Sequence, residues 1–249
     1  IAARTIGFSG ADLHNLVNEA ALTAARVGLN EVNEHCFELA RDRITLGEER
    51  DARLPPQERE AVAYHECGHA LMAYFMPNAD PLTKLTIIPH GMAMGVTEQT
   101  PRDDHYTYTE SYLKDRIKVM LGGRCAEKLI YGEVSTGAQN DLKEATTLIR
   151  RMIGQWGMSD KIGPLGLNIG EEHVFLGREM GHPREFSEKM AEQIDSEIQA
   201  QLLALEKATL EFLTDHRTQL EALAQAVLKQ ETLSAEEVRD ILEQDAANA

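Results

Sequence analysis

The sequence predicts a mostly α-helical protein with one small β-sheet. Apolar residues recur at helical spacing through most of the 249 residues, as amphipathic helices require. Only residues 84–88 and 92–97 are short and extended in character, and Pro89 and Gly91 lie between them. A hydrophobic fraction of 43% with 27% charged residues is ordinary for a globular protein. We therefore expect a helical core that carries a single ribbon.

The first 47 residues are expected to form a small helical domain. Ser9 suits the N-cap of its first helix. The apolar stripe predicted to be buried on this helix consists of Leu13, Leu16, Val17, Ala20, Ala21 and Ala24. A second helix is predicted over residues 32–46 and ends at Gly47. Residues 48–53 are charged with little to bury, so we place a linker there.

Residues 54–249 are expected to form a second, larger domain. Its first helix is predicted to run from the Pro55-Pro56 pair to Phe75, because proline is tolerated in a first helical turn. Further helices are predicted over residues 112–130, 141–155, 187–216, 219–228 and 234–242. The two extended segments then form a hairpin or ribbon, and the glycine-rich residues 154–170 form a loop with at most one strand.

Charge and composition exclude several classes of function. Lys and Arg total 25 against 41 Asp and Glu, a net charge of −16, so we expect no nucleic-acid partner. Three scattered cysteines, Cys36, Cys67 and Cys125, form no CxxC pair and favour a reducing compartment. No apolar run reaches 18 residues, and the GxxxxGK[ST] phosphate loop is absent. We expect the chain to be part of a longer protein.

The most informative motif is His65-Glu66-Cys67-Gly68-His69. On a helix, positions i and i+4 lie about 40° apart, so both imidazoles can reach one ion. Glu66 lies about 100° round the helix from His65, where it can take a proton from a water molecule at the metal. The alternative is a pair of core histidines with a solvated glutamate. The flanking residues are apolar nearly all round, and burying these polar groups without a shared partner is costly.

A catalytic zinc usually has three protein ligands and one open position. The metzincin pattern would need glycine at Met72 and histidine at Phe75, so the third ligand must come from another helix. Asp141 and Glu127 both lie on apolar helix faces and compete for this role. Asp141 could instead favour a helix N-terminus, and Glu127 could pair with Arg124 or support a ligating histidine. The residues alone leave both open.

Five ordered segments resemble the protease domain of the FtsH family, membrane-anchored, ATP-dependent AAA zinc metalloproteases. They are His65–His69, Lys84–Gly91 (KLTIIPHG), Leu121–Glu127 (LGGRCAE), Ser135–Asp141 (STGAQND) and Gln155–Asp160 (QWGMSD). In addition, Gly7–Leu13 (GFSGADL) resembles the start of the AAA lid subdomain of this family. The resemblance implies a helical zinc-protease domain with a small ribbon near the active site, preceded by an all-α AAA lid.

The resemblance also implies roles for residues and partners. His65, His69 and Asp141 would bind one Zn²⁺ per chain, Glu66 would be the catalytic base, and Glu127 would support a ligand. ATP and Mg²⁺ are expected only in an ATPase core that this sequence lacks. Family members form homo-hexamers that degrade misfolded membrane proteins and short-lived soluble proteins, a role in protein quality control. The expected location is the cytoplasmic side of a bacterial inner membrane, reached through segments absent from this chain, or else a mitochondrial or chloroplast membrane.

Two hypotheses remain for the ribbon and the metal. As an endopeptidase, the chain could hold an unfolded polypeptide by strand addition along residues 85–97, with Thr86, Ile88, Gly95 and Val96 as candidate contacts. As a non-catalytic helical module for ring assembly, it would carry a structural zinc closed by four protein ligands.

Overall fold

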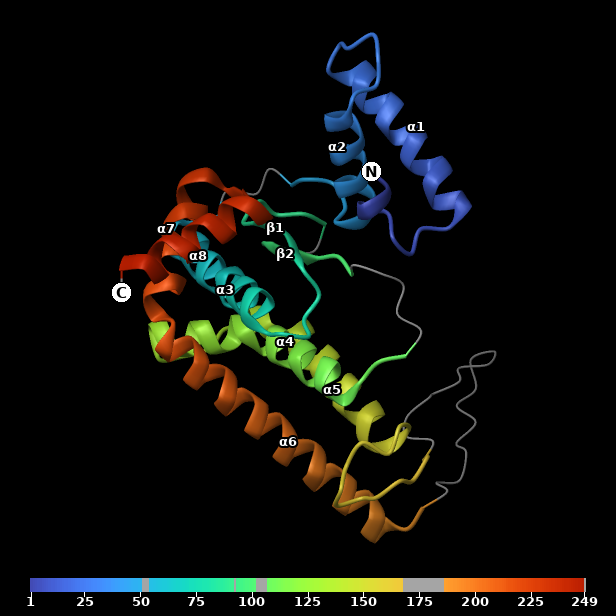
Figure 1. The fold of residues 1–249 in the computed structure, drawn as a ribbon, viewed down its shortest axis with the longest axis vertical. Coiled ribbons are helices and arrows are strands. Elements are labelled where there is room, and N and C mark those ends of the chain that lie inside the picture. Colours follow the sequence, from blue (N-terminus) through green and yellow to red (C-terminus); the bar gives the residue numbers. More distant parts are fainter. Residues whose placement is uncertain (51–53, 92, 102–106, 168–185, 249) are drawn as a thin grey trace.

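The computed structural model describes residues 1–50, 54–91, 93–101, 107–167 and 186–248, and it confirms a mostly helical fold with one small sheet (Figure 1). The helices are α1 (Gly10–Arg26), α2 (Glu34–Thr45), α3 (Pro56–Phe75), α4 (Glu110–Tyr131), α5 (Gln139–Gly154), α6 (Glu188–Asp215), α7 (Arg217–Gln230) and α8 (Ala235–Asn248). The strands are β1 (Leu82–Thr86), β2 (Val96–Gln99) and β3 (Thr232–Ser234), and the 3-10 turns are η1 (Ala2–Arg4) and η2 (Thr136–Ala138).

Helices α1 and α2 pack on each other around an apolar cluster of their own. Ser9 caps α1 as predicted, because its side chain accepts from Asp12 N while Asp12 accepts from Ser9 N. The buried members of the cluster are Leu16, Ala20, Ala24, Cys36 and Ala40. The prediction was wrong for Leu13, Val17 and Ala21, which are exposed since α2 covers only the neighbouring face of α1.

Helix α3 has the predicted bounds and crosses α4 at two glycines. A Cβ atom on Gly68 would overlap Gly122 O, and one on Gly122 would lie 2.6 Å from Gly68 O. The two backbones are therefore in direct contact, which glycine alone permits. This crossing presses the polar face of α3 against α4. Cys67 lies on the opposite side and is completely buried, as its position on the helix predicts.

The sheet has the order β2-β1-β3 and is antiparallel throughout. The predicted ribbon is confirmed, although its strands are displaced to 82–86 and 96–99, and position 92 lies outside the described residues. Strand β3 was not predicted, and Ser234, expected to begin the last helix, ends β3 and accepts from Glu237 N. The glycine-rich segment contains no strand in its described part, residues 154–167.

The segment between α2 and α3 was predicted as a linker, and its described residues contact the connection between β1 and β2. Arg50 N donates to Pro89 O (2.8 Å), and Gly91 N donates to Glu48 O (3.1 Å). Residues 51–53 lie outside the described part. As Figure 1 shows, β1 and β2 lie between α2 on one side and α3 on the other.

The main core is formed by the six helices from α3 through α8 together with the sheet. Its largest fully buried side chains include Leu71, Met72, Ile117, Ile149, Leu213 and Leu220. All three cysteines are buried thiols without a disulfide. In the part of the chain that the structure describes, no helix has the length and apolar character needed to cross a membrane.

Candidate metal centre

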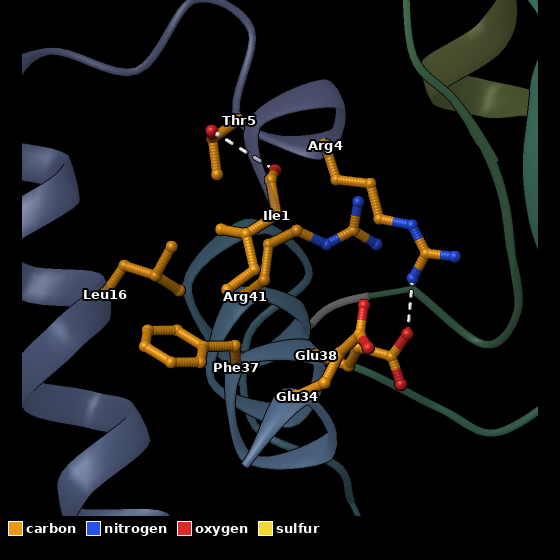
Figure 2. A pocket seen from close by; sticks show the side chains of 8 residues that line it. All are labelled: Ile1, Arg4, Thr5, Leu16, Glu34, Phe37, Glu38 and Arg41. Atoms are coloured by element: carbon orange, nitrogen blue, oxygen red, sulfur yellow. Dashed lines mark hydrogen bonds and ion pairs between the residues drawn. The ribbon is translucent and has the colours of Figure 1, made fainter. Parts of the chain in front are cut away.

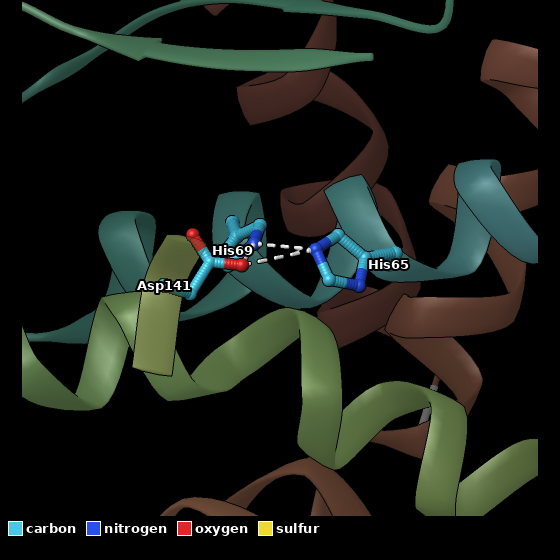
Figure 3. Close-up of side chains that lie close together, drawn as sticks. All are labelled: His65, His69 and Asp141. Atoms are coloured by element: carbon cyan, nitrogen blue, oxygen red, sulfur yellow. Dashed lines mark hydrogen bonds and ion pairs between the residues drawn. The ribbon is translucent and has the colours of Figure 1, made fainter. Parts of the chain in front are cut away.

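Three side chains from two helices converge on one point. His65 and His69 lie one turn apart on α3, and Asp141 projects from the first turn of α5 towards both rings (Figure 3). His65 Nε2 lies 3.0 Å from His69 Nε2, and Asp141 Oδ2 lies 3.3 Å and 3.5 Å from these two atoms. Zinc bonds of about 2.0–2.1 Å in a tetrahedron place ligand atoms about 3.3 Å apart. The donor set and its spacing therefore fit a zinc ion.

Helix α4 forms the wall of this site through a residue without a side chain. A Cβ atom on Gly123 would lie 2.5 Å from His65 Nε2 and 2.6 Å from His69 Nε2. Only glycine leaves room for both imidazoles. Sequence reasoning missed this role, and the available signal was a glycine pair inside an otherwise helical pattern.

A second set of contacts orients the two rings. Glu127 Oε1 lies 2.7 Å from His65 Nδ1, and Val119 O lies 2.7 Å from His69 Nδ1. Both acceptors lie on the Nδ1 side, so the neutral, metal-binding form of each ring carries its proton there and turns Nε2 towards Asp141. This geometry favours Asp141 over Glu127 as the third ligand, because Asp141 lies beside both Nε2 atoms and Glu127 contacts only Nδ1 of His65. Arg124 pairs with Glu206 (3.1 Å) rather than with Glu127.

The electrostatics of the site favour a cation. Burial opposes the charged imidazole of His65, but hydrogen bonds with Asp141 and Glu127 outweigh it and raise the pKa of His65 to about 10. Burial likewise opposes the charged form of Asp141, yet contacts with His65 and His69 hold its pKa well below the usual range. The pKa of Glu127 is lowered by His65 and Ser135 against the effect of burial. Two ionised carboxylates beside buried imidazoles form a site for a positive charge.

Glu66 is buried beside this cluster and faces strand β2. Thr97 Oγ1 lies 2.8 Å from Glu66 Oε2 and 2.9 Å from Glu66 O. Gly95 packs against the same side chain, since a Cβ there would lie 2.7 Å from Glu66 Cγ. Sequence reasoning did not identify Thr97, whose strand is only four residues long.

The structure divides the candidate substrate contacts into two groups. Thr86 is completely buried on the central strand, where β2 and β3 occupy both edges, so no further strand can pair with it. Ile88 N donates to Thr86 Oγ1 (3.2 Å), so its backbone donor is already used. Among the described strands, β2 keeps one edge without a partner. All four residues stay candidates, with strand addition itself assigned to the edge beside Gly95 and Val96.

A separate hollow of about 290 Å³ lies in the α1–α2 unit (Figure 2). It is lined by Ile1, Arg4, Thr5, Leu16, Glu34, Phe37, Glu38 and Arg41. Arg4 pairs with Glu38 at its mouth (2.6 Å). The hollow shares no residue with the His65, His69 and Asp141 cluster.

Both parts of the chain are similar to known proteins. The profile of Peptidase family M41 matches residues 52–241, and that of the AAA+ lid domain matches residues 1–39. The chain is 78% identical over 244 residues to a protein of Marinobacter nauticus named ATP-dependent zinc metalloprotease FtsH, covering 98% of this chain and 38% of that protein. It is 53% identical over 241 residues to a protein of the same name from Nitrosococcus oceani, covering 97% of this chain and 38% of that protein. The chain thus spans well under half the length of these relatives.

Proposed function

The chain belongs to peptidase family M41, and on that premise we propose that it is the zinc-dependent endopeptidase part of an ATP-dependent protease. His65, His69 and Asp141 would hold one zinc ion, and Glu66 would be the catalytic base. Residues 1–47 would be an AAA lid, 48–53 a linker and 54–249 the protease domain. The observation that carries the proposal is that the donor atoms of His65, His69 and Asp141 all lie within 4.8 Å of one another. Glu66, the residue that follows His65, is buried.

In this proposal each residue has a separate task in peptide hydrolysis. Bound zinc would act as a Lewis acid on the scissile carbonyl and on the attacking water. Glu66 accepts a proton from that water and delivers it to the nitrogen of the departing amine. Glu127 and Val119 O keep the two imidazoles turned towards the metal position. Glu66 and both histidines are buried, so bulk solvent has little access to their polar atoms.

Substrate would bind along the open edge of β2. Backbone hydrogen bonds to an added strand tolerate almost any side chain, which suits an enzyme acting on unfolded polypeptides. Gln99→Pro removes a backbone donor from this edge, because alternate residues of β2 face away from β1 and Thr100 N already donates to Pro81 O on the β1 side. It should raise KM several-fold with little change in kcat. An unchanged KM would remove the strand from the proposal.

The longer protein would supply the remaining parts. By analogy with the named relatives, we propose an ATPase core that binds ATP and Mg²⁺ outside this chain. The resemblance to the family leads us to propose assembly as a homo-hexamer. Membrane segments outside the chain would hold the protease on the cytoplasmic side of a bacterial inner membrane, or on an organellar membrane. Its substrates would be misfolded membrane proteins and short-lived soluble proteins, and the charge of −16 disfavours nucleic acid.

The deciding experiment is Glu66→Gln. The variant should keep its zinc, measured by atomic absorption, and lose cleavage of a fluorescently labelled unfolded polypeptide. Glu60→Gln, the same change at an exposed position of α3, should keep both. Persisting cleavage in Glu66→Gln would show that the base is misassigned. A structural zinc would instead need a fourth protein ligand, and the cluster found among the described residues has three members.

A further inference from the structure

We propose that Thr97 is the positioning residue of the general base, holding Glu66 in the orientation that proton transfer requires; this inference rests on the proposed function. A general base must come within about 2.6–3.2 Å of the group whose proton it takes. Glutamate has three rotatable side-chain bonds, so its helix alone does not fix where its carboxylate points. Something outside α3 must select one orientation.

The contacts of Thr97 supply this selection. Its hydroxyl has one proton to donate, and it lies 2.8 Å from Glu66 Oε2 and 2.9 Å from Glu66 O. A charged carboxylate is a stronger acceptor than a backbone carbonyl, so Oε2 takes the larger share of this bond. Among the hydrogen bonds of the described residues, no other reaches the Glu66 carboxylate. Oε1 is therefore left for the proton that the reaction moves.

The backbone at the start of β2 excludes other orientations of the Glu66 side chain. A Cβ atom on Gly95, the residue before β2, would lie 2.7 Å from Glu66 Cγ and 3.0 Å from Glu66 Oε1, so the backbone at the start of the strand lies directly on the side chain. Gly95 and Thr97 are two residues apart, and both contact Glu66. One residue excludes other rotamers by contact, and the other selects the remaining rotamer by a hydrogen bond.

Thr97 is itself held firmly. It pairs with Leu85 in the antiparallel ladder between β2 and β1, and Leu85 is completely buried. Its β-branched side chain has few χ1 choices, so a fixed backbone also fixes the hydroxyl. No hydrogen bond joins Thr97 to His65, His69 or Asp141 in the described part of the chain. Its effect on the reaction should therefore be separable from metal binding.

The test compares three variants of the zinc-loaded chain. Thr97→Val keeps the shape and removes the hydroxyl, Thr97→Ser keeps the hydroxyl, and Thr83→Val is the matched control. Thr83 lies on β1, and its hydroxyl donates to Thr100 Oγ1 (3.0 Å) instead of to Glu66. Losing a hydrogen bond to a charged group should lower kcat of Thr97→Val about 10- to 100-fold. KM and zinc content should stay within about twofold, Thr97→Ser should recover most of kcat, and Thr83→Val should match the parent.

A second readout does not depend on cleavage. The ¹³C resonance of the Glu66 carboxyl carbon, assigned as the one missing from Glu66→Gln, should move in Thr97→Val, return in Thr97→Ser and stay in place in Thr83→Val. If the parent cleaves but Thr97→Val has an unchanged kcat, or if Thr97→Ser fails to restore it, the inference is overturned and the proposed function stands. If the zinc-loaded parent does not cleave, the proposed function fails, and an unmoved resonance in Thr97→Val would overturn the positioning of Glu66 separately.

Discussion

Glu127 joins His65 to the turn that leads to Asp141. Its Oε1 lies 2.7 Å from His65 Nδ1, and the same carboxylate accepts hydrogen bonds from Ser135 N (2.6 Å) and Ser135 Oγ (2.9 Å). Asp141 comes six residues after Ser135, in the first turn of α5. One buried carboxylate thus orients the first proposed ligand and anchors the segment that carries the third.

Glu127→Gln should therefore weaken zinc binding without removing a ligand. The amide keeps the size of the side chain but loses the charge that favours a proton on His65 Nδ1. We expect zinc affinity to fall about 10- to 100-fold, as found for outer contacts of metal ligands, measured by competition with a chromophoric chelator. Glu133→Gln, on the exposed part of the same turn, should bind zinc like the parent. Equal affinities for parent and Glu127→Gln would contradict this role.

Gly123→Ala tests the wall of the site. The added methyl group would lie 2.5 Å from His65 Nε2, so the imidazole must move away from the metal position. Zinc affinity should fall at least about tenfold, while alanine slightly favours the helix itself. Gly10→Ala is the control, because a Cβ there meets nothing within 4 Å. Normal zinc binding by Gly123→Ala would mean that α4 does not limit the site.

The sequence was sufficient for the parts of the site that lie on one helix. The angular relation of His65, Glu66 and His69 follows from helical geometry, so it could be predicted before any tertiary structure was known. The choice between Asp141 and Glu127 could not. It depends on how α4 and α5 are placed against α3, and the contact between Gly68 and Gly122 sets the close approach of α4 to α3. Residue chemistry makes both carboxylates suitable, and only packing brings one of them to the Nε2 atoms.

Short elements and one-sided packing account for the remaining differences between the predictions from the sequence and the structure. Strand β3 has three residues, too few to show an alternating pattern, and it forms only because β1 offers a free edge. Thr97 on β2 contacts Glu66 on α3, 31 residues away in the sequence, so no local pattern indicates this contact. The exposure of Leu13 and Val17 has a related cause, since apolar spacing marks a helix face without showing how much of it a partner covers.

A buried arginine connects α2 to strand β2 of the sheet. Arg41 Nη2 lies 2.6 Å from Glu98 Oε2 and 3.0 Å from Asp42 Oδ1, and Lys84 Nζ lies 2.6 Å from Asp42 Oδ2. Arg41→Met would leave two largely buried carboxylates with one lysine. We expect a loss of about 1–3 kcal/mol in the stability of this contact. Hydrogen exchange of α2 amides should speed up correspondingly.

The control for this prediction is Glu38→Gln on the same helix. Glu38 pairs with Arg4, and both side chains are more than 40% exposed, so loss of this pair should change exchange little. Equal exchange rates in Arg41→Met and Glu38→Gln would show that the buried network does not hold α2 to the sheet.

The pKa of His65 makes the stability of the zinc-free chain depend on pH in a defined direction. Folding raises this pKa from about 6.5 to about 10, so the folded chain holds a proton that the unfolded chain releases. The resulting stabilisation is complete below about pH 6.5 and is lost as pH rises towards 10. In EDTA, the urea midpoint should therefore fall steadily between pH 6.5 and 9. With zinc the ligand is already deprotonated, so this fall should be largely absent. His65→Gln should also abolish it, and a zinc-free midpoint that stays level or rises over this range would show that His65 does not hold the proton in the folded chain.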